Sequence, residues 1–350
     1  MATLPSVSPG AAARMTDIVI APPATPPPPP ASQLYALGDA RSPFDLYASS
    51  PLSLERTAGE RAQLKALVEV FPPKVDGFLF RSEAEVNAVI ALHQALGDLH
   101  ADCAWASLNV HDTRTLLCFA RARRLDVKAA ESMWRAAYAW RKSYEPEQAL
   151  KGYILPAALD QFGTGGQFGL DREGSPIMLD NLGQIDPVSL LRNISDFEIV
   201  ESEICKLEKL QALVDLRVIE TGKLHHGCTV IIDLKHLGAQ HLNSKGLHVL
   251  KLILENNDAN YPERAKRVLV VNAPFIFGVI WKIVQLFLDP VTREKVQIFS
   301  GVPHDVLVKY IADDQLAVEY GGKAAWPRTV RRGGVVPKHW TDEFHDVAPA

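Results

Sequence analysis

Charged residues stand on both sides of one strongly apolar stretch of the sequence, residues 275–288, and their types are those that bind phosphate and hydroxyl groups. They are Glu263, Arg264, Arg267, Arg293, Glu294 and Lys295. Arginine binds phosphate as a planar fork, lysine binds it as a point charge, and a carboxylate can orient hydroxyl groups or a cation. One such run is usually a solvated face. Two runs around one apolar unit favour a headgroup site beside a cavity for an acyl chain.

The apolar stretch itself predicts a helix over 275–288. Of these 14 residues 11 are apolar, and the exceptions fall on one stripe that continues into Asp289. The exceptions are Gly278, Lys282 and Gln285. A helix needs about 20 apolar residues to cross a bilayer, so this one is too short to span a membrane. It is either a core helix or a helix whose apolar surface meets lipid, and its periodicity leaves both open.

Strands and helices are predicted to alternate around this segment. Buried strands are predicted at 228–234 and 267–272, and amphipathic helices at 195–221 and 243–257. Further elements are a strand at 175–180, a strand that ends at Phe299 and a helix at 304–311. This alternation indicates an α/β domain with a mostly parallel sheet.

The N-terminal part of the chain predicts a leader followed by helices. Residues 1–50 are rich in Pro, Ala and Ser and contain a polyproline tract, Pro26–Pro30, so we expect a disordered leader. Docking of an SH3 or WW module on that tract is the alternative. Helical stretches are predicted from Leu54 to Val70, from Ser82 to Leu96 and, as a pair broken near Leu125–Val127, from Arg114 to Ser143.

Composition excludes several classes of protein. The formal net charge of −4 argues against a general nucleic-acid-binding surface, and 47% apolar residues are enough for a large core. The four cysteines, Cys103, Cys118, Cys205 and Cys228, are far apart and are interpreted as reduced thiols. No signal peptide or 18-residue apolar run is present, which indicates a soluble or peripheral protein.

Motifs of catalysis or metal binding are not found. The segment 163–169 is rich in glycine but lacks the Lys-Ser/Thr ending of a phosphate loop, and we interpret it as a turn that leads to the strand at 175–180, with 171–174 as a hairpin turn. The adjacent His225 and His226 have no third ligand nearby in sequence and are interpreted as a polar loop. A nucleotide-binding or hydrolase enzyme is therefore the less supported alternative, and no cofactor or metal is predicted.

Seven blocks of sequence occur together in one order. They are Leu116–Val127, Trp140–Lys142, Thr229–Lys235, Tyr261–Arg264, Val271–Pro274, Phe287–Thr292 and Leu316–Gly322. In this order they resemble the signature blocks of the CRAL-TRIO, or Sec14-like, lipid-binding family and cover about residues 112–323. The resemblance implies an N-terminal helical bundle followed by an α/β lipid-binding cage with a mostly parallel sheet and a mobile gating helix. The implied divisions are a leader at 1–50, the helical module at 51–145, the lipid-binding domain at 146–323 and a basic polar tail at 324–350.

The resemblance also implies a set of site residues. The headgroup residues of phosphatidylinositol-binding members match Arg123, Glu263, Arg264 and Lys295. The implied pocket and gate residues are Met178, Thr229, Phe275, Phe277, Ile280, Trp281, Val284 and Phe287. A structural salt bridge remains the alternative role for Glu263, Arg264 and Lys295. Met178 and Gly227 replace a tyrosine and a serine of phosphatidylcholine-binding members, which argues against that cargo.

The function implied by the resemblance is non-enzymatic lipid binding and transfer between membranes. The expected cargo is a single phosphatidylinositol in a hydrophobic pocket closed by helix 275–288. Expected partners are membrane surfaces and a lipid kinase, with no nucleic acid, and the protein is expected to be a cytoplasmic monomer that binds membranes transiently. The alternatives are a sterol, tocopherol, retinoid or other apolar ligand in the same fold, or a lipid-sensing scaffold.

Overall fold

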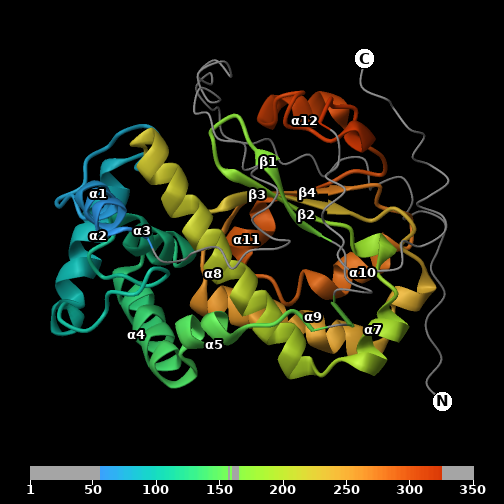
Figure 1. The fold of residues 1–350 in the computed structure, drawn as a ribbon, viewed down its shortest axis with the longest axis horizontal. Coiled ribbons are helices and arrows are strands. Elements are labelled where there is room, and N and C mark those ends of the chain that lie inside the picture. The colour runs from blue at the N-terminus through green and yellow to red at the C-terminus, as the bar shows by residue number, and fades with distance from the viewer. Residues whose placement is uncertain (1–55, 157, 160–164, 325–350) are drawn as a thin grey trace.

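The computed structural model shows a helical unit followed by an α/β unit (Figure 1). It describes residues 56–156, 158–159 and 165–324. The predicted leader at 1–50 and the predicted tail beyond residue 324 lie outside the described residues. The predicted order, helices first and a mostly parallel sheet second, is confirmed.

The helical unit is built from helices, most of which carry a capping side chain at the N terminus. The helices are α1 (Ala58–Val68), α2 (Glu83–Ala95), α3 (Thr113–Ala122), α4 (Val127–Tyr144) and α5 (Pro146–Gly152), with a 3-10 turn, η4 (Gly97–Leu99), after α2. Thr57, Ser82, Asp112 and Asp126 each accept a hydrogen bond from the first turn of the helix that follows. The predicted break between Arg114 and Ser143 is the turn that separates α3 from α4.

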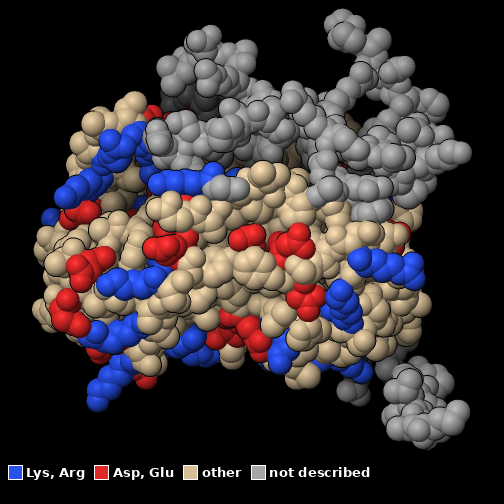
Figure 2. All heavy atoms as spheres, turned by 60° about the horizontal axis from the view of Figure 1, so that its bottom comes forward, with Lys and Arg blue, Asp and Glu red and all other residues tan. Residues whose placement is uncertain are grey.

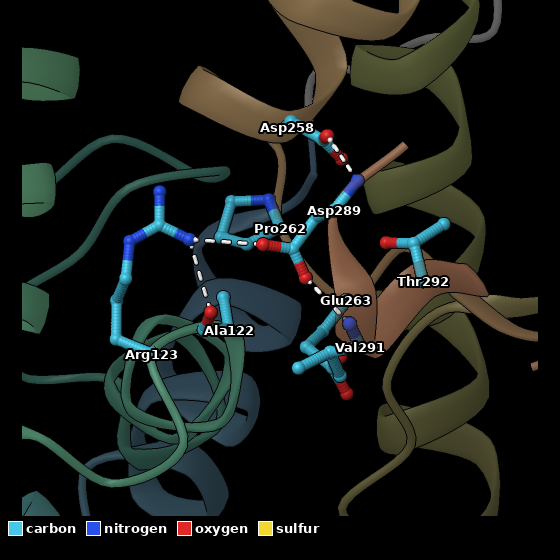
Figure 3. Close-up of a pocket in the computed structure, with 8 residues that line it drawn as sticks. All are labelled: Ala122, Arg123, Asp258, Pro262, Glu263, Asp289, Val291 and Thr292. Atoms are coloured by element: carbon cyan, nitrogen blue, oxygen red, sulfur yellow. Dashed lines mark hydrogen bonds and ion pairs between the residues drawn. The ribbon is translucent and has the colours of Figure 1, made fainter. Parts of the chain in front are cut away.

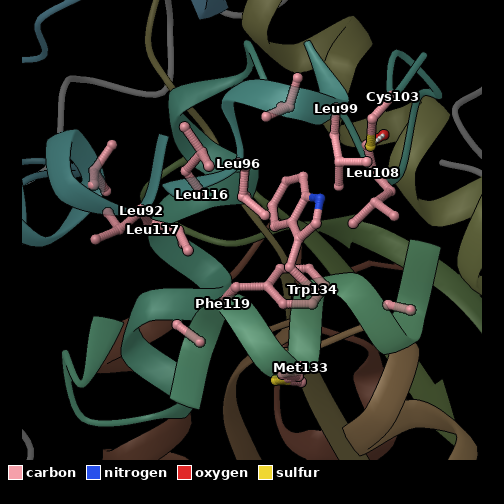
Figure 4. Packing of buried hydrophobic residues seen from close by; sticks show 14 of the residues in the cluster. Leu92, Leu96, Leu99, Cys103, Leu108, Leu116, Leu117, Phe119, Met133 and Trp134 are labelled. Atoms are coloured by element: carbon pink, nitrogen blue, oxygen red, sulfur yellow. Dashed lines mark hydrogen bonds between the residues drawn. The ribbon is translucent and has the colours of Figure 1, made fainter. Parts of the chain in front are cut away.

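Trp134 of α4 is the centre of the helical core (Figure 4). Its side chain is fully buried, and its ring lies 4.7 Å from that of Phe119 on α3. Leucines from α2, α3 and the intervening loop surround the pair, including Leu96 and Leu116. This packing fixes the end of α3, which carries Arg123.

The α/β unit contains one five-stranded sheet in sequence order. Its strands are β1 (Gly166–Leu170), β2 (Pro176–Asp180), β3 (Cys228–Asp233), β4 (Ala265–Val271) and β5 (Val296–Ile298). β1 pairs with β2 in antiparallel orientation, and the remaining pairs are parallel. The strands predicted at 175–180, 228–234 and 267–272 are therefore confirmed within one or two residues.

The prediction of a turn over 163–169 was wrong for its second half, because Gly166–Leu170 is the edge strand β1. Glycine permits this strand to lie close to its neighbours. A Cβ on Gly165 would lie 2.8 Å from the carbonyl oxygen of Leu179, and Gly169 has a φ of +69°. The hairpin turn at 171–174 is confirmed, since Gly174 donates its backbone N–H to Asp171.

Helices cover both faces of the sheet (Figure 1). They are α7 (Pro187–Asn193), α8 (Asp196–Thr221), α9 (Ser244–Asn260), α10 (Phe277–Val284), α11 (Pro290–Glu294) and α12 (His304–Tyr310), with 3-10 turns η5 (Leu182–Gln184), η6 (Ala239–His241) and η7 (Val318–Tyr320). One face, which carries Ile231 and Leu269, packs against α12. The opposite face, which carries Met178 and Val270, packs against α8 and α10.

The helix predicted over 275–288 is shorter in the structure. α10 spans only Phe277–Val284, and the rest of the predicted range forms turns. No side chain caps its N terminus, where Ile276 stands, and Arg293 Nη2 donates to the carbonyl oxygen of Gln285 at 2.6 Å. That side-chain hydrogen bond satisfies a carbonyl group at the helix end.

Candidate functional site

A small pocket lies where the ends of α3, α9 and α11 meet the loop before β4 (Figure 3). It is lined by Ala122, Arg123, Asp258, Pro262, Glu263, Asp289, Val291 and Thr292. In this conformation the pocket has room for about one water molecule. Two of the four predicted headgroup residues, Arg123 and Glu263, therefore line the same pocket, although they are far apart in the sequence.

Arg123 reaches the pocket from the C-terminal end of α3. Its Nη1 atom donates to the carbonyl oxygen of Ala122 at 2.9 Å and lies 3.5 Å from Asp289 Oδ2. The side chain is 32% exposed, and the contact with Asp289 is long for a charge-assisted hydrogen bond. Arg123 is thus accessible to an anionic group that enters the pocket.

Glu263 and Lys295 form an ion pair at the edge of the pocket. Lys295 follows α11 directly, and its ammonium also donates to the carbonyl oxygen of Ala265 at 3.3 Å. Glu263 has a φ of +62°, a conformation that is costly for a residue other than glycine. Gly227 permits this loop to approach β3, because a Cβ there would lie 2.8 Å from the carbonyl oxygen of Glu263.

Arg264 turns away from the pocket. Its guanidinium donates to the side chain of Gln211 on α8 and, at 3.1 Å, to the carbonyl oxygen of Ser107 in the helical unit. Its own carbonyl oxygen accepts the backbone N–H of Cys228 at 2.8 Å. The structure therefore brings together Arg123, Glu263 and Lys295 and gives Arg264 a different surrounding, in which it fixes the loop rather than lining the pocket.

The pocket also contains two carboxylates that we did not predict as site residues. Asp289 caps α11 and accepts the backbone N–H of Val291 at 2.7 Å, and its own N–H donates to Asp258 Oδ2 at 3.0 Å. Asp289 lies in the block Phe287–Thr292, which resembles the family, so the sequence could have indicated it as a site residue. Asp258 lies near the end of α9, outside all of these blocks, and no sequence pattern marks it. Burial, and then the charge of Asp289, raise its pKa.

Comparison with known proteins identifies the domain that contributes most of the residues lining this pocket. Residues 160–322 match the family model of the CRAL/TRIO domain. These residues form a CRAL/TRIO, or Sec14-like, domain. The chain therefore carries a CRAL/TRIO lipid-binding domain, which the sequence resemblance predicted.

Several known proteins are similar in sequence to this chain over part of their length. Protein real-time of Aedes aegypti is 32% identical over 234 residues, which cover 66% of this chain and 36% of that protein. A CRAL-TRIO domain-containing protein of Caenorhabditis elegans is 31% identical over 228 residues, which cover 64% of this chain and 31% of that protein. The chain thus spans about a third of the length of these relatives. The crystal structure of Sfh5 shares the fold, with a TM-score of 0.54 and 18% identity over 70% of this chain and 88% of that one.

The CRAL/TRIO sheet separates two residues that we predicted in one pocket. Met178 pairs with Val230 and faces α8, whereas Thr229 pairs with Arg267 and lies on the opposite face. Thr229 is fully buried, donates to Asp171 Oδ2 at 2.7 Å and accepts from Arg267 at 2.9 Å. The structure does not bring Thr229 to the pocket face, because neighbouring residues of a strand point to opposite sides.

The predicted gate residues of the CRAL/TRIO domain divide into an inner and an outer set. Phe277 and Ile280 are buried against β4 and β5, and Trp281 and Val284 pack at the edge of the same cluster. Phe287 is partly buried, with the ammonium of Lys251 6.0 Å from its ring centre. Phe275 is 72% exposed and belongs to the outer surface.

The cysteines are buried, and the surface charge on the visible face is mixed. The four cysteines are free and buried, and burial raises the pKa of Cys118 to about 11 and of Cys228 to about 12, so these thiols are poor nucleophiles. Basic and acidic side chains are interspersed on the face shown in Figure 2. Among the residues that the structure describes, no helix is long and apolar enough to cross a membrane, and no group of side chains could hold a metal ion.

Because His225 and His226 are buried, the free energy of unfolding is expected to depend on pH. His225 and His226 are buried in the loop before β3, so burial, aided by nearby Lys266, lowers the pKa of His225 to about 3 and that of His226 well below its usual value. Because the unfolded chain binds these protons more readily, the stabilisation is complete above about pH 6.5 and is lost as the pH falls below that value. We expect the free energy of unfolding to fall by about 1 kcal/mol per histidine between pH 6.5 and 5.5, measured by urea unfolding.

Two variants test the origin of this pH dependence. The double variant H225Q/H226Q should flatten the dependence, whereas His248→Gln, at an exposed position, should leave it unchanged. Equal slopes in the wild type and both variants would contradict the prediction.

Proposed function

We propose that the chain binds one phosphatidylinositol molecule and transfers it between membranes without catalysing a reaction. The observation that carries this proposal is that Arg123 and Glu263 line one pocket and Lys295 pairs with Glu263 beside it. The phosphodiester is held by Arg123 and Lys295, and the inositol hydroxyl groups donate hydrogen bonds to Glu263.

The strained backbone at Glu263 supports a binding role for this residue. A positive φ at a residue other than glycine is costly, and such residues persist where the surroundings hold them and often at functional sites. Here Tyr261 and Arg264 hold the loop on both sides of Glu263, since Tyr261 donates to Glu208 at 2.7 Å and Arg264 bridges Gln211 and Ser107. The ion pair keeps both charges in place until a headgroup enters between them.

The acyl chains are assigned to the sheet face below α10. Val230 and Ile232 lie on the central strand β3 yet are only partly buried, whereas Ile231, on the other face of the same strand, is 2% exposed. A central strand with accessible apolar side chains leaves apolar surface for a ligand. Each methylene group that moves from water to such a surface contributes about 0.8 kcal/mol. Movement of Phe277 and Ile280 away from β4 would open this space to a membrane.

The outer surface of the gate supports contact with lipid. Phe275, Val279 and Leu286 are 72%, 52% and 75% exposed, and with Lys282 they follow a helical spacing along one side of residues 275–288. Exposed apolar groups next to a lysine are typical of a segment that lies in a membrane interface. The gate is therefore assigned to the membrane-facing side.

The gate assignment predicts a loss of membrane binding. The variant F275S/L286S is expected to bind vesicles of phosphatidylcholine with 20% anionic lipid at least about tenfold more weakly, because each removed side chain withdraws roughly 1.5–3 kcal/mol of burial. Co-sedimentation with the vesicles measures this. Phe197→Ser removes a ring that is 63% exposed at the start of α8 and is the matched control. Equal binding by both variants would show that the gate does not meet the membrane.

Identification of the retained lipid tests the proposal directly. The purified protein is incubated with phosphatidylcholine vesicles that contain a small fraction of phosphatidylinositol, separated from them and extracted for mass spectrometry. We expect about one phosphatidylinositol per chain, enriched far above its fraction in the vesicles. Retention of phosphatidylcholine alone, or of no phospholipid, would overturn the proposed cargo.

A further inference from the structure

The proposed headgroup pocket carries more negative than positive charge. Three carboxylates, those of Asp258, Glu263 and Asp289, stand against two cations, Arg123 in the lining and Lys295 beside it. Each cation already has a carboxylate partner, since Arg123 lies 3.5 Å from Asp289 and Lys295 pairs with Glu263. The third carboxylate, Asp258, forms no ion pair with any residue that the structure describes, and it accepts the backbone N–H of Asp289 at 3.0 Å.

The position of Asp258 strengthens its negative potential. It lies in the last turn of α9, a helix of 17 residues, where the helix dipole is negative. Burial, and then the charge of Asp289, raise the pKa of Asp258, although the hydrogen bond from Asp289 and the positive charges of Arg123 and Lys295 act in the opposite direction. Figure 3 shows the carboxyl group of Asp258 beside Asp289, whose own carboxylate points towards Arg123.

We infer that Asp258 determines the specificity of the pocket by admitting an unphosphorylated inositol ring and excluding inositol lipids that carry a phosphate monoester on the ring. This inference rests on the proposed function. The carboxylate accepts a hydrogen bond from a ring hydroxyl group, whereas a ring phosphate would bring a second anion towards it.

Phosphatidylinositol and its ring-phosphorylated forms differ in charge, and this difference is the basis of the proposed selectivity. The phosphodiester of phosphatidylinositol carries one negative charge, which Arg123 and Lys295 can match. A monoester adds a charge of about −1.5 to −2 at neutral pH. No unpaired cation of the pocket lining is left for it, and its interaction with Asp258 is repulsive over the few ångströms available in the pocket.

The experiment compares two lipids and three proteins. Vesicles that contain equal amounts of phosphatidylinositol and phosphatidylinositol 4-phosphate are offered to the wild type, Asp258→Asn and Glu255→Gln, and the retained lipids are quantified. Asn retains an oxygen that can accept the N–H of Asp289, so the fold is conserved, which thermal unfolding checks. Glu255 is one turn earlier on α9, is exposed and pairs with Lys251 at 3.5 Å, so its variant removes the same charge outside the pocket.

We expect the wild type and Glu255→Gln to retain mainly phosphatidylinositol, and Asp258→Asn to shift the ratio at least about tenfold towards the 4-phosphate. If all three proteins retain phosphatidylinositol with the same ratio, the role of Asp258 is overturned and the proposed function stands. If the wild type retains neither lipid, the proposed function fails and this inference fails with it.

Discussion

Replacement of Arg114 by Met is expected to destabilise the fold by about 3–5 kcal/mol, which is the usual cost of removing one partner from a buried ion pair. Arg114 is 4% exposed and joins the two units of the protein. Its guanidinium lies 2.6 Å from Asp112, which caps α3, and 2.8 Å from Asp215 of α8, and it donates to the carbonyl oxygen of His225 at 3.2 Å. Met fills the volume but leaves Asp112 buried without its cation.

The free energy of unfolding in urea measures this effect. Arg135→Ala is the matched control, because Arg135 forms an equally close pair with Asp98 on the surface of the helical unit, and exposed pairs contribute little. The expected order is a large loss for Arg114→Met and a small one for Arg135→Ala. Similar losses in the two variants would mean that the Arg114 network does not hold the units together.

Replacement of Lys295 by Met is expected to weaken phosphatidylinositol binding by roughly 10- to 100-fold, the equivalent of one charge-assisted hydrogen bond to the phosphodiester. The same change leaves Glu263, whose side chain is 8% exposed, without its cation, so it also lowers stability. Binding is measured as the lipid retained per folded chain. Arg124→Ala removes an exposed cation beside Arg123, and it should bind lipid like the wild type.

A double variant separates the headgroup role of Lys295 from the alternative of a structural salt bridge. E263Q/K295M has no unpaired buried charge and is expected to regain stability relative to Lys295→Met, because the carboxylate no longer needs a partner. If Lys295 binds the headgroup, lipid binding stays low in the double variant. Recovery of binding together with stability would show that the pair is only structural.

The order of elements was predictable from the sequence because burial imposes a local pattern. The β-branched runs at 228–234 and 267–272 became neighbouring parallel strands, since a strand covered on both faces is rich in apolar residues rather than alternating with polar ones. Capping residues such as Ser195, which accepts the N–H of Glu198 at 3.2 Å, fixed the start of long helices. These signals involve only residues close together in the sequence.

Side-chain direction at the site was less predictable because it depends on partners that are distant in the sequence. Arg264 turns towards Ser107 and Gln211, and neither residue has a pattern that points to residue 264. Thr229 was placed in the pocket without the register of β3 against β2, which puts it opposite to Met178. Asp258 lies four residues before Pro262 and enters the site only because α9 ends beside α11.

The remaining differences between the predicted and the observed elements involve glycine residues and the end of a short helix. Gly166–Leu170 resembled a turn because its glycines hide the alternation of a strand, and they are present because β1 lies close to Leu179 and Gln315. The apolar composition of residues 275–288 predicted a longer helix than α10, since apolar content does not mark where a helix ends.

Transfer of lipid between vesicles is the most direct test of the proposal that the protein carries phosphatidylinositol. Donor vesicles carry labelled phosphatidylinositol or labelled phosphatidylcholine, unlabelled acceptors are in excess, and the wild-type protein is added in catalytic amount. We expect rapid transfer of phosphatidylinositol and little transfer of phosphatidylcholine. Movement of neither lipid, or equal movement of both, would contradict the proposed function, because the pocket lined by Arg123 and Glu263, with Lys295 beside it, would then not select the cargo.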